Sequence, residues 1–370
     1  MTDPATTQSM HRLVKRHMPA LDGLRGIAIL LVLAHGFDVI RTQTGPGHDI
    51  DLVLDLGWIG VQLFFVLSGF LITGILLDSQ GSPTYYKNFF ARRVLRIFPL
   101  YYGVLIVAYA LVPLIITPPA GHGDHQIWLW TYTENFAEPL GKTEPAFPHF
   151  WSLAVEEQFY LVWPFVVRFA GRVGVIVLGV VLVGVAIGSR LYVRQRWGDD
   201  AAYMFTPCRM DALAIGAVAA ALVRGERIGR RLVAWGPKRT AITGSLLVIG
   251  GAVLGHLLRT GPTMQTGGYS LLALGFAVVM IAALSPEALP ARLLSMSWLR
   301  RVGTYSYGMY VFHAPLHLFV GMPILAHIAP SPGTSAGLAY AAVATLATFA
   351  VGAVSYHVYE RRFLAWKPPR

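Results

Sequence analysis

Two ionisable side chains in the first apolar stretch of the sequence are the most direct candidates for chemistry. Arg25 follows residues 21–24 (LDGL), and His35 lies ten residues further on. An ionisable group inside a membrane is costly and is therefore a candidate for function. Because a neutral imidazole is a good general base near pH 7, we predict that His35 removes a proton during a reaction. The alternatives are a structural histidine and an interfacial anchor in which Arg25 pairs with Asp22.

A second group of polar side chains lies in residues 149–160 (HFWSLAVEEQFY). Ser152 and Glu156 are four residues apart, so a helix places them on one face. A carboxylate bonded to an imidazole fixes its tautomer and stabilises the imidazolium, so we predict that Glu156 holds His35. Glu157 points about 100° away from Glu156 on a helix and therefore has a different role. We expect Glu157 and Ser152 to bind substrate; the alternative is a structural pair of glutamates.

Three arginines form a basic strip in residues 89–99 (FFARRVLRIFP), namely Arg92, Arg93 and Arg96. Arg92 and Arg96 share a helix face, and Arg93 is close by. Guanidinium groups bind phosphates through charge-assisted, bidentate hydrogen bonds. Coenzyme A carries several phosphates, and a ligand of this kind would fit the strip. The alternative is contact with lipid headgroups at the positively charged inner end of a helix.

The remaining candidates lie later in the chain. Arg209 and Asp211 open a further apolar stretch, where an internal ion pair and contacts with substrate hydroxyls would both fit; we predict substrate binding. His313 and His317 are four apart and could frame a metal ion, but no third ligand is nearby. We therefore expect no metal and assign His313 to substrate binding. The only cysteine is Cys208, which excludes an internal disulfide and a cysteine-based metal site.

Composition identifies the elements that must hold these side chains as membrane helices. The chain has 370 residues, of which 55% are hydrophobic and 13% charged, and its mean hydropathy is +0.54. Soluble domains carry about 25% charged residues. Several apolar runs reach the roughly 20 residues that cross a bilayer. We therefore predict an all-α polytopic membrane protein with about ten transmembrane helices, at residues 23–41, 57–77, 97–117, 150–168, 172–190, 205–223, 240–258, 268–285, 303–327 and 335–358.

The distribution of lysine and arginine predicts the orientation. With the N-terminus in the cytoplasm, 23 of the 30 basic residues lie on inner segments and 6, including Arg190, on outer segments. We therefore predict a multi-pass plasma membrane protein with both termini cytoplasmic. The net charge of +11 then reflects this bias and not a nucleic-acid partner.

The chain divides into one membrane domain and two tails. We predict a cytoplasmic tail at residues 1–20, which lacks the apolar core of a signal peptide, a transmembrane domain at 21–360 and a basic tail at 361–370. The longest connection, residues 118–149, is expected to be a solvated outer loop. A metal site at His122, Asp124 and His125 is the alternative there.

Six motifs in this order resemble the acyltransferase family 3 membrane proteins. They are residues 21–28 (LDGLRGIA), 60–72 (GVQLFFVLSGFLI), 92–99 (RRVLRIFP), 151–157 (WSLAVEE), 305–313 (YSYGMYVFH) and 355–357 (SYH). The resemblance implies ten-helix transferases that move an acyl group from acetyl-CoA or a related thioester to an extracytoplasmic sugar. It also implies that Arg25, His35 and Glu156 are essential. The family usually has ten residues between that arginine and histidine; this sequence has nine, which turns the two side chains about 80° apart on a regular helix.

The sequence therefore predicts an O-acyltransferase. It would move an acetyl or other short acyl group from cytoplasmic acyl-CoA to a hydroxyl of a sugar, in a cell-envelope glycan or a glycosylated metabolite. Its partners would be the lipid bilayer, acyl-CoA and the carbohydrate acceptor; the sequence specifies no oligomeric state. The alternative is a transporter or flippase for acyl donors or glycans, because proton-coupled carriers also hold intramembrane histidine and glutamate. Only an enzyme would change the acceptor covalently.

Overall fold

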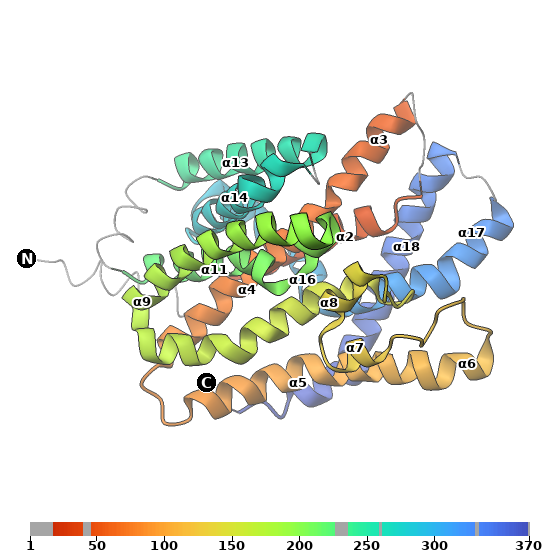
Figure 1. The fold of residues 1–370 in the computed structure, drawn as a ribbon, viewed down its shortest axis with the longest axis horizontal. Helices are drawn as coiled ribbons and strands as arrows, with labels where there is room; N and C mark the ends of the chain where they lie inside the picture. Colours follow the sequence, from red (N-terminus) through yellow and green to blue (C-terminus); the bar gives the residue numbers. More distant parts are fainter. Residues whose placement is uncertain (1–17, 40–45, 226–235, 259–260, 330–332, 369–370) are drawn as a thin grey trace, which may run out of the picture. The chain divides into compact units, whose positions relative to one another are not determined.

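The computed structural model describes residues 18–39, 46–225, 236–258, 261–329 and 333–368, which contain helices and no strand (Figure 1). Eight helical segments within these ranges are long and apolar enough to cross a membrane, judged by length and composition. The protein is therefore an all-α polytopic membrane protein, as predicted. Most of the predicted N-terminal tail and of the basic segment at 224–239 lies outside the described residues.

Two features relate these eight segments to the ten predicted helices. α9 (Trp151–Trp197) is one helical segment of 47 residues that covers the predicted helices at 150–168 and 172–190. Gly171 interrupts it with φ 60° and ψ −170°, a conformation that glycine adopts without steric cost. α13 (Pro237–Leu258) is helical where the seventh span was predicted, although it is not among the eight segments.

The chain forms two compact units, and the boundaries between them fall inside α2 (Pro19–Gly36), α9 and α16 (Ser297–Leu316). Unit 1 comprises Met1–Ala28, Ile59–Gln80 and Phe159–Thr304. Besides parts of those three helices it contains α4 (Ile59–Asp78), α10 (Asp199–Met204), α11 (Thr206–Val223), α13, η5 (Met264–Gly268), α14 (Tyr269–Ala282) and α15 (Leu289–Leu294).

Close helix crossings hold unit 1 together. α4 packs against α11, and α13 packs against α14. A Cβ added at Gly69 would lie 2.0 Å from the carbonyl oxygen of Leu213, and one at Gly216 would lie 2.1 Å from that of Val66. Small residues at such crossings let helix backbones meet closely in a membrane. Gly69, in the motif at 60–72, therefore lets α4 and α11 pack closely.

Unit 2 comprises Ile29–Trp58, Gly81–Gln158 and Tyr305–Arg370. Its first half contains α3 (Pro46–Asp55), η1 (Leu56–Trp58), α5 (Tyr85–Ile106), η2 (Val107–Leu111), α6 (Val112–Ile115), α7 (Ile127–Trp130), α8 (Glu134–Ala137), η3 (Glu138–Leu140) and η4 (Pro148–Phe150). Its last part contains η6 (His317–Gly321), α17 (Met322–Ile328), α18 (Thr334–Ser355), η7 (Tyr356–Glu360) and α19 (Arg361–Leu364).

Residues 118–149, called the connecting segment below, form a loop with short helical turns that is partly exposed, as predicted, and partly packed. Glu144 is 5% exposed and accepts hydrogen bonds from the Tyr109 hydroxyl (2.9 Å) and from the backbone N–H groups of Gly123 (2.9 Å) and His125 (2.5 Å). This carboxylate supplies acceptors that the irregular backbone lacks. Among the described residues, no group of three or more His, Cys, Asp or Glu side chains could hold a metal ion.

Candidate active site

His35 lies against a carboxylate in unit 2. Its Nδ1 is 3.3 Å from Oδ1 of Asp55, and the two side chains are 35% and 42% exposed. η1, which follows Asp55, fits against the end of α2 because of Gly57, where a Cβ would lie 2.9 Å from Cβ of His35 and 2.1 Å from the carbonyl oxygen of Leu31. A carboxylate beside Nδ1 favours a proton on that nitrogen and leaves Nε2 as an acceptor. This is the arrangement that a general base needs.

His313 presents a second oriented imidazole in the same unit. Its side chain is 4% exposed, and its Nδ1 lies 2.7 Å from the carbonyl oxygen of Tyr310. A carbonyl only accepts hydrogen bonds, so Nδ1 carries the proton and Nε2 is the basic nitrogen. A Cβ added at Gly36 would lie 3.1 Å from Cδ2 and 3.4 Å from Nε2 of His313. The absence of a side chain next to His35 thus makes room for the second ring.

η4, which directly precedes α9, adds a third imidazole. The rings of His149 and His313 have centroids 4.3 Å apart. The hydroxyls of Ser152 and Tyr310 bond to each other, and each is also within hydrogen-bond distance of the carbonyl oxygen of His149, at 3.1 and 2.9 Å. Ser152 is 4% exposed and is occupied by these bonds. Its predicted role in substrate binding stays a prediction.

The two glutamates of the WSLAVEE motif also lie in unit 2, with the basic strip. The carboxyl of Glu157 interacts electrostatically with Arg93 and with Glu156. Tyr307 donates a hydrogen bond to the carbonyl oxygen of Ile97 (2.8 Å) and interacts with Glu156 and Glu157 and with Arg96. The carboxylate next to His35 is Asp55, so the idea that Glu156 holds His35 stays a prediction. Eight predicted site residues thus lie in one unit, namely His35, Arg92, Arg93, Arg96, Ser152, Glu156, Glu157 and His313.

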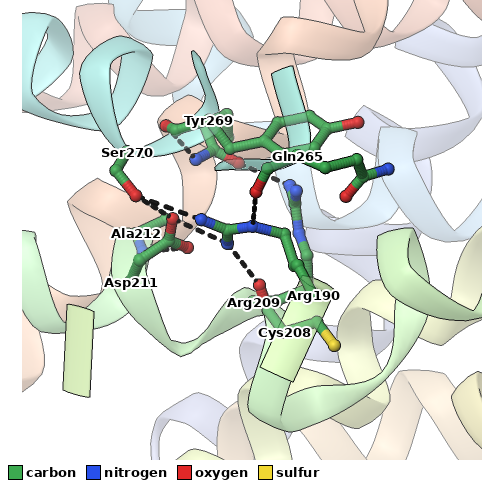
Figure 2. A network of polar contacts seen from close by, with 9 residues as sticks. Arg190, Cys208, Arg209, Asp211, Ala212, Gln265, Tyr269 and Ser270 are labelled. Atoms are coloured by element: carbon green, nitrogen blue, oxygen red, sulfur yellow. Dashed lines mark hydrogen bonds and ion pairs between the residues drawn. The ribbon is translucent and has the colours of Figure 1, made fainter. Parts of the chain in front are cut away.

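Three predicted site residues belong to unit 1. Nη1 of Arg25 lies 3.9 Å from Oδ1 of Asp22. This is the ion pair that was considered as the alternative role of Arg25. α2 is α-helical throughout Pro19–Gly36, so no bulge within it changes the offset between positions 25 and 35. Arg209 and Asp211 lie at the start of α11, in the network shown in Figure 2.

The network in Figure 2 is a fully buried ion pair with its hydrogen bonds completed by neighbours. Nη1 of Arg190 lies 2.9 Å from Oδ2 of Asp211, and both side chains are 0% exposed. Asp211 also accepts hydrogen bonds from the Ser270 hydroxyl (2.6 Å) and the backbone N–H of Ala212 (2.8 Å). The guanidinium of Arg209 bonds to Gln62 and lies over the ring of Tyr269 at 4.8 Å. For Asp211 the structure therefore shows the internal ion pair, and substrate binding stays a prediction.

Sequence reasoning missed three residues of these clusters. Asp55 stands at the edge of an apolar run, where a carboxylate usually ends a helix, and only its contact with His35 singles it out. His149 lies in the segment 149–160 that contains Glu156, but the ring that it contacts, His313, is far away in the sequence. Arg190 was counted among the outer basic residues, and the structure corrects this because its side chain is fully buried.

The fold and the clusters define a class: a polytopic helical membrane protein with oriented imidazoles, carboxylates and arginines inside its helices. A family model described as "Acyltransferase domain" matches residues 18–357. The chain therefore belongs to the acyltransferase family 3 proteins, and the family resemblance of the six motifs is confirmed.

Curated relatives carry the same domain in longer chains. The peptidoglycan O-acetyltransferase OatA of Listeria monocytogenes is 28% identical over 377 residues, which cover 94% of this chain and 56% of the relative. YrhL of Bacillus subtilis is 26% identical over 94% of this chain and 55% of its own. The O-acetyltransferase OatA of Staphylococcus aureus is 27% identical over 85% of this chain and 53% of its own. The chain thus spans about half the length of these relatives, and no solved structure matches it.

Proposed function

We propose that this protein is a membrane O-acyltransferase that moves an acetyl or other short acyl group from acyl-CoA to a hydroxyl of a sugar in a glycan. Membership of the acyltransferase family and the names of the O-acetyltransferase relatives support the reaction and the glycan acceptor. The single observation that carries the proposal is the contact between His35 and Asp55, at 3.3 Å, beside the oriented ring of His313.

The chemistry follows from the free nitrogens of these two rings. Nε2 of His35 takes the proton of the acceptor hydroxyl while its oxygen attacks the thioester carbonyl. Asp55 stabilises the imidazolium that forms, as a carboxylate beside a catalytic imidazole does. The C–S bond of the thioester then breaks, a C–O ester bond replaces it, and the proton passes from the imidazolium to the thiolate of coenzyme A. His313 binds the acceptor hydroxyl or its neighbour through Nε2.

The donor would bind at the basic strip. Arg92, Arg93 and Arg96 project from α5, and the positive-inside pattern places this end of α5 in the cytoplasm, where acyl-CoA is made. Their guanidinium groups would hold the phosphates of the donor. In the family resemblance the position of Arg25 is essential for transfer, and we keep that role for it. If the protein lies in the plasma membrane with both termini in the cytoplasm, the acceptor sugar would reach the site from the outer side of the membrane.

The other candidates would contact the acceptor. We assign Glu157 to the hydroxyls of the sugar, since a carboxylate accepts hydrogen bonds from two hydroxyls at once, and we keep for Glu156 its predicted role of holding the ring of His35. Ser152, Arg209 and Asp211 keep their predicted roles in substrate binding as weaker parts of the proposal, because each already has partners inside the protein.

Acyl transfer by the purified protein tests the proposal. The chain would be placed in lipid nanodiscs with radiolabelled acetyl-CoA and a sugar oligomer, and the product identified by mass spectrometry. His35→Ala should abolish transfer, whereas His327→Ala, at an exposed histidine of α17, should leave it unchanged. Full activity of the His35→Ala variant would refute the assigned base. Movement of sugar or donor across the membrane without a covalent product would favour the transporter.

A further inference from the structure

The connecting segment contains a buried carboxyl group for which the described residues provide no hydrogen-bond partner. Glu134, at the start of α8, is 5% exposed, and both of its carboxyl oxygens are buried without a hydrogen-bond partner among the described residues. Leaving such a group unbonded costs about 1–3 kcal/mol, so native proteins almost always pair it. Burial raises the pKa of Glu134 well above its ordinary value, which keeps the carboxyl able both to donate and to accept a hydrogen bond.

A second group of this kind lies two residues earlier. Tyr132 is 7% exposed, and its hydroxyl is buried without a hydrogen-bond partner among the residues that the structure describes. Its backbone has φ 53°, which is rare for a residue with a side chain. Its ring stacks on that of Tyr101, with centroids 4.1 Å apart and planes at 20°. The segment therefore holds this ring in place while leaving its hydroxyl unused.

The two groups adjoin one cluster of aromatic and acidic side chains in unit 2. Tyr102 interacts electrostatically with both Glu134 and Glu157, and Tyr132 interacts with Glu157 and Tyr102. The ring of Tyr102 also stacks on Trp130, with centroids 5.8 Å apart and planes at 12°. Aromatic faces beside unused hydroxyl and carboxyl groups suit a sugar, whose C–H faces pack on rings while its hydroxyls form hydrogen bonds.

We propose that Glu134 and Tyr132 form a subsite that binds an uncharged, hydroxyl-bearing face of the acceptor sugar. This inference rests on the proposed function, which makes the acceptor a sugar. The sugar hydroxyls supply the partners that the carboxyl and the phenol lack within the protein. Because burial keeps the Glu134 carboxyl protonated, neither it nor the Tyr132 phenol carries a charge, so a neutral face of the sugar fits them. The positive-inside pattern puts the connecting segment on the outer side, where an extracytoplasmic glycan would arrive.

Two isosteric variants of the full chain test the subsite. Tyr132→Phe and Glu134→Gln would be assayed in nanodiscs with acetyl-CoA as donor and a neutral N-acetylglucosamine tetramer as acceptor probe. Each should raise the KM for the tetramer about tenfold, the effect of losing one hydrogen bond of about 1.4 kcal/mol, and leave the KM for acetyl-CoA within about twofold. The matched controls are Tyr192→Phe and Glu287→Gln, at exposed positions, which should change neither KM.

Thermal unfolding separates binding from folding in the same variants. Because the Tyr132 hydroxyl has no hydrogen-bond partner among the described residues, Tyr132→Phe breaks none of the bonds described and should not lower the Tm. An unchanged KM for the tetramer in both variants would overturn the subsite. Direct binding of the tetramer, measured by saturation-transfer NMR, tests the subsite without turnover. A wild-type protein that acylates no sugar, with or without such binding, would instead refute the proposed function.

Discussion

Asparagine at position 211 should destabilise the protein strongly, because Asp211 is half of a fully buried ion pair. Its partner Arg190 lies 2.9 Å away, and both side chains are 0% exposed. Removing one charge from such a pair costs about 3–5 kcal/mol, because the other charge stays buried without compensation. An unfolding entropy of about 2.1 cal/mol/K per residue gives about 0.8 kcal/mol/K for a chain of 370 residues. The Tm should therefore fall by about 4–6 °C.

Intrinsic fluorescence of the nine tryptophans reports this unfolding in detergent or nanodiscs. The matched control is Asp78→Asn, which removes the acidic partner of Arg224 at the same 2.9 Å, from a pair that is 35% and 11% exposed. A partly exposed pair contributes about 0–1 kcal/mol, so its Tm should fall by no more than about 1 °C. Arg190→Met combined with Asp211→Leu should recover much of the loss, since it leaves no unpaired charge.

The same variant decides between the two roles considered for Asp211. A structural ion pair predicts a lower Tm with an unchanged KM for the acceptor in the protein that stays folded. A substrate contact predicts a raised KM with a Tm shift no larger than that of Asp78→Asn. The second result would refute the reading of Figure 2 as an internal, structural network.

Three further perturbations test the site and the connecting segment. Asp55→Asn should lower kcat about 10–100-fold with little change in KM, because an amide cannot stabilise an imidazolium as a carboxylate does; an unchanged kcat would show that His35 acts without Asp55. Gly36→Ala should lower kcat about tenfold by pushing the ring of His313 away from its 3.1 Å approach, while Gly184→Ala, with nothing within 4 Å, should not. The raised pKa of Glu134 means that the folded protein keeps a proton that the unfolded chain loses above its ordinary pKa of 4.5. The contribution of Glu134 to the free energy of unfolding should therefore be greatest below that pH and fall as pH rises. The Tm of Glu134→Gln, measured against pH, should show a smaller fall than that of the wild type.

The membrane class could be predicted from sequence because it depends on local composition alone. Apolar runs of about 20 residues locate the helices, and the interruption of α9 at Gly171 lies in the gap at 169–171 between two predicted helices. The connecting segment could not be predicted, since its packing depends on the contacts of Glu144 with Tyr109 and with the backbone around Gly123. Polar composition alone looks the same in a solvated loop and in one ordered by a buried carboxylate.

The site was harder to predict than the helices because its pairs join distant segments. His35 could be found as a base from its own position, but Asp55 becomes its partner only because Gly57 lets η1 lie against α2. His149 and His313 meet although 164 positions separate them (313 − 149). Residue type and helical spacing thus identify candidates, whereas pairing requires the fold.

Hydrogen bonding separates ionisable groups that hold the structure from those that await a ligand. Asp211 has bonds to Arg190, Ser270 and a backbone N–H, and these bonds explain how the fold keeps this carboxylate buried. Glu134 is also buried, but its carboxyl oxygens have no hydrogen-bond partner among the described residues, and the fold alone gives no reason to keep it. A buried carboxyl without a partner is disfavoured unless something outside the protein completes it. Burial makes both carboxyl groups costly, and the inventory of their partners fits a folding role for Asp211 and the proposed binding role for Glu134.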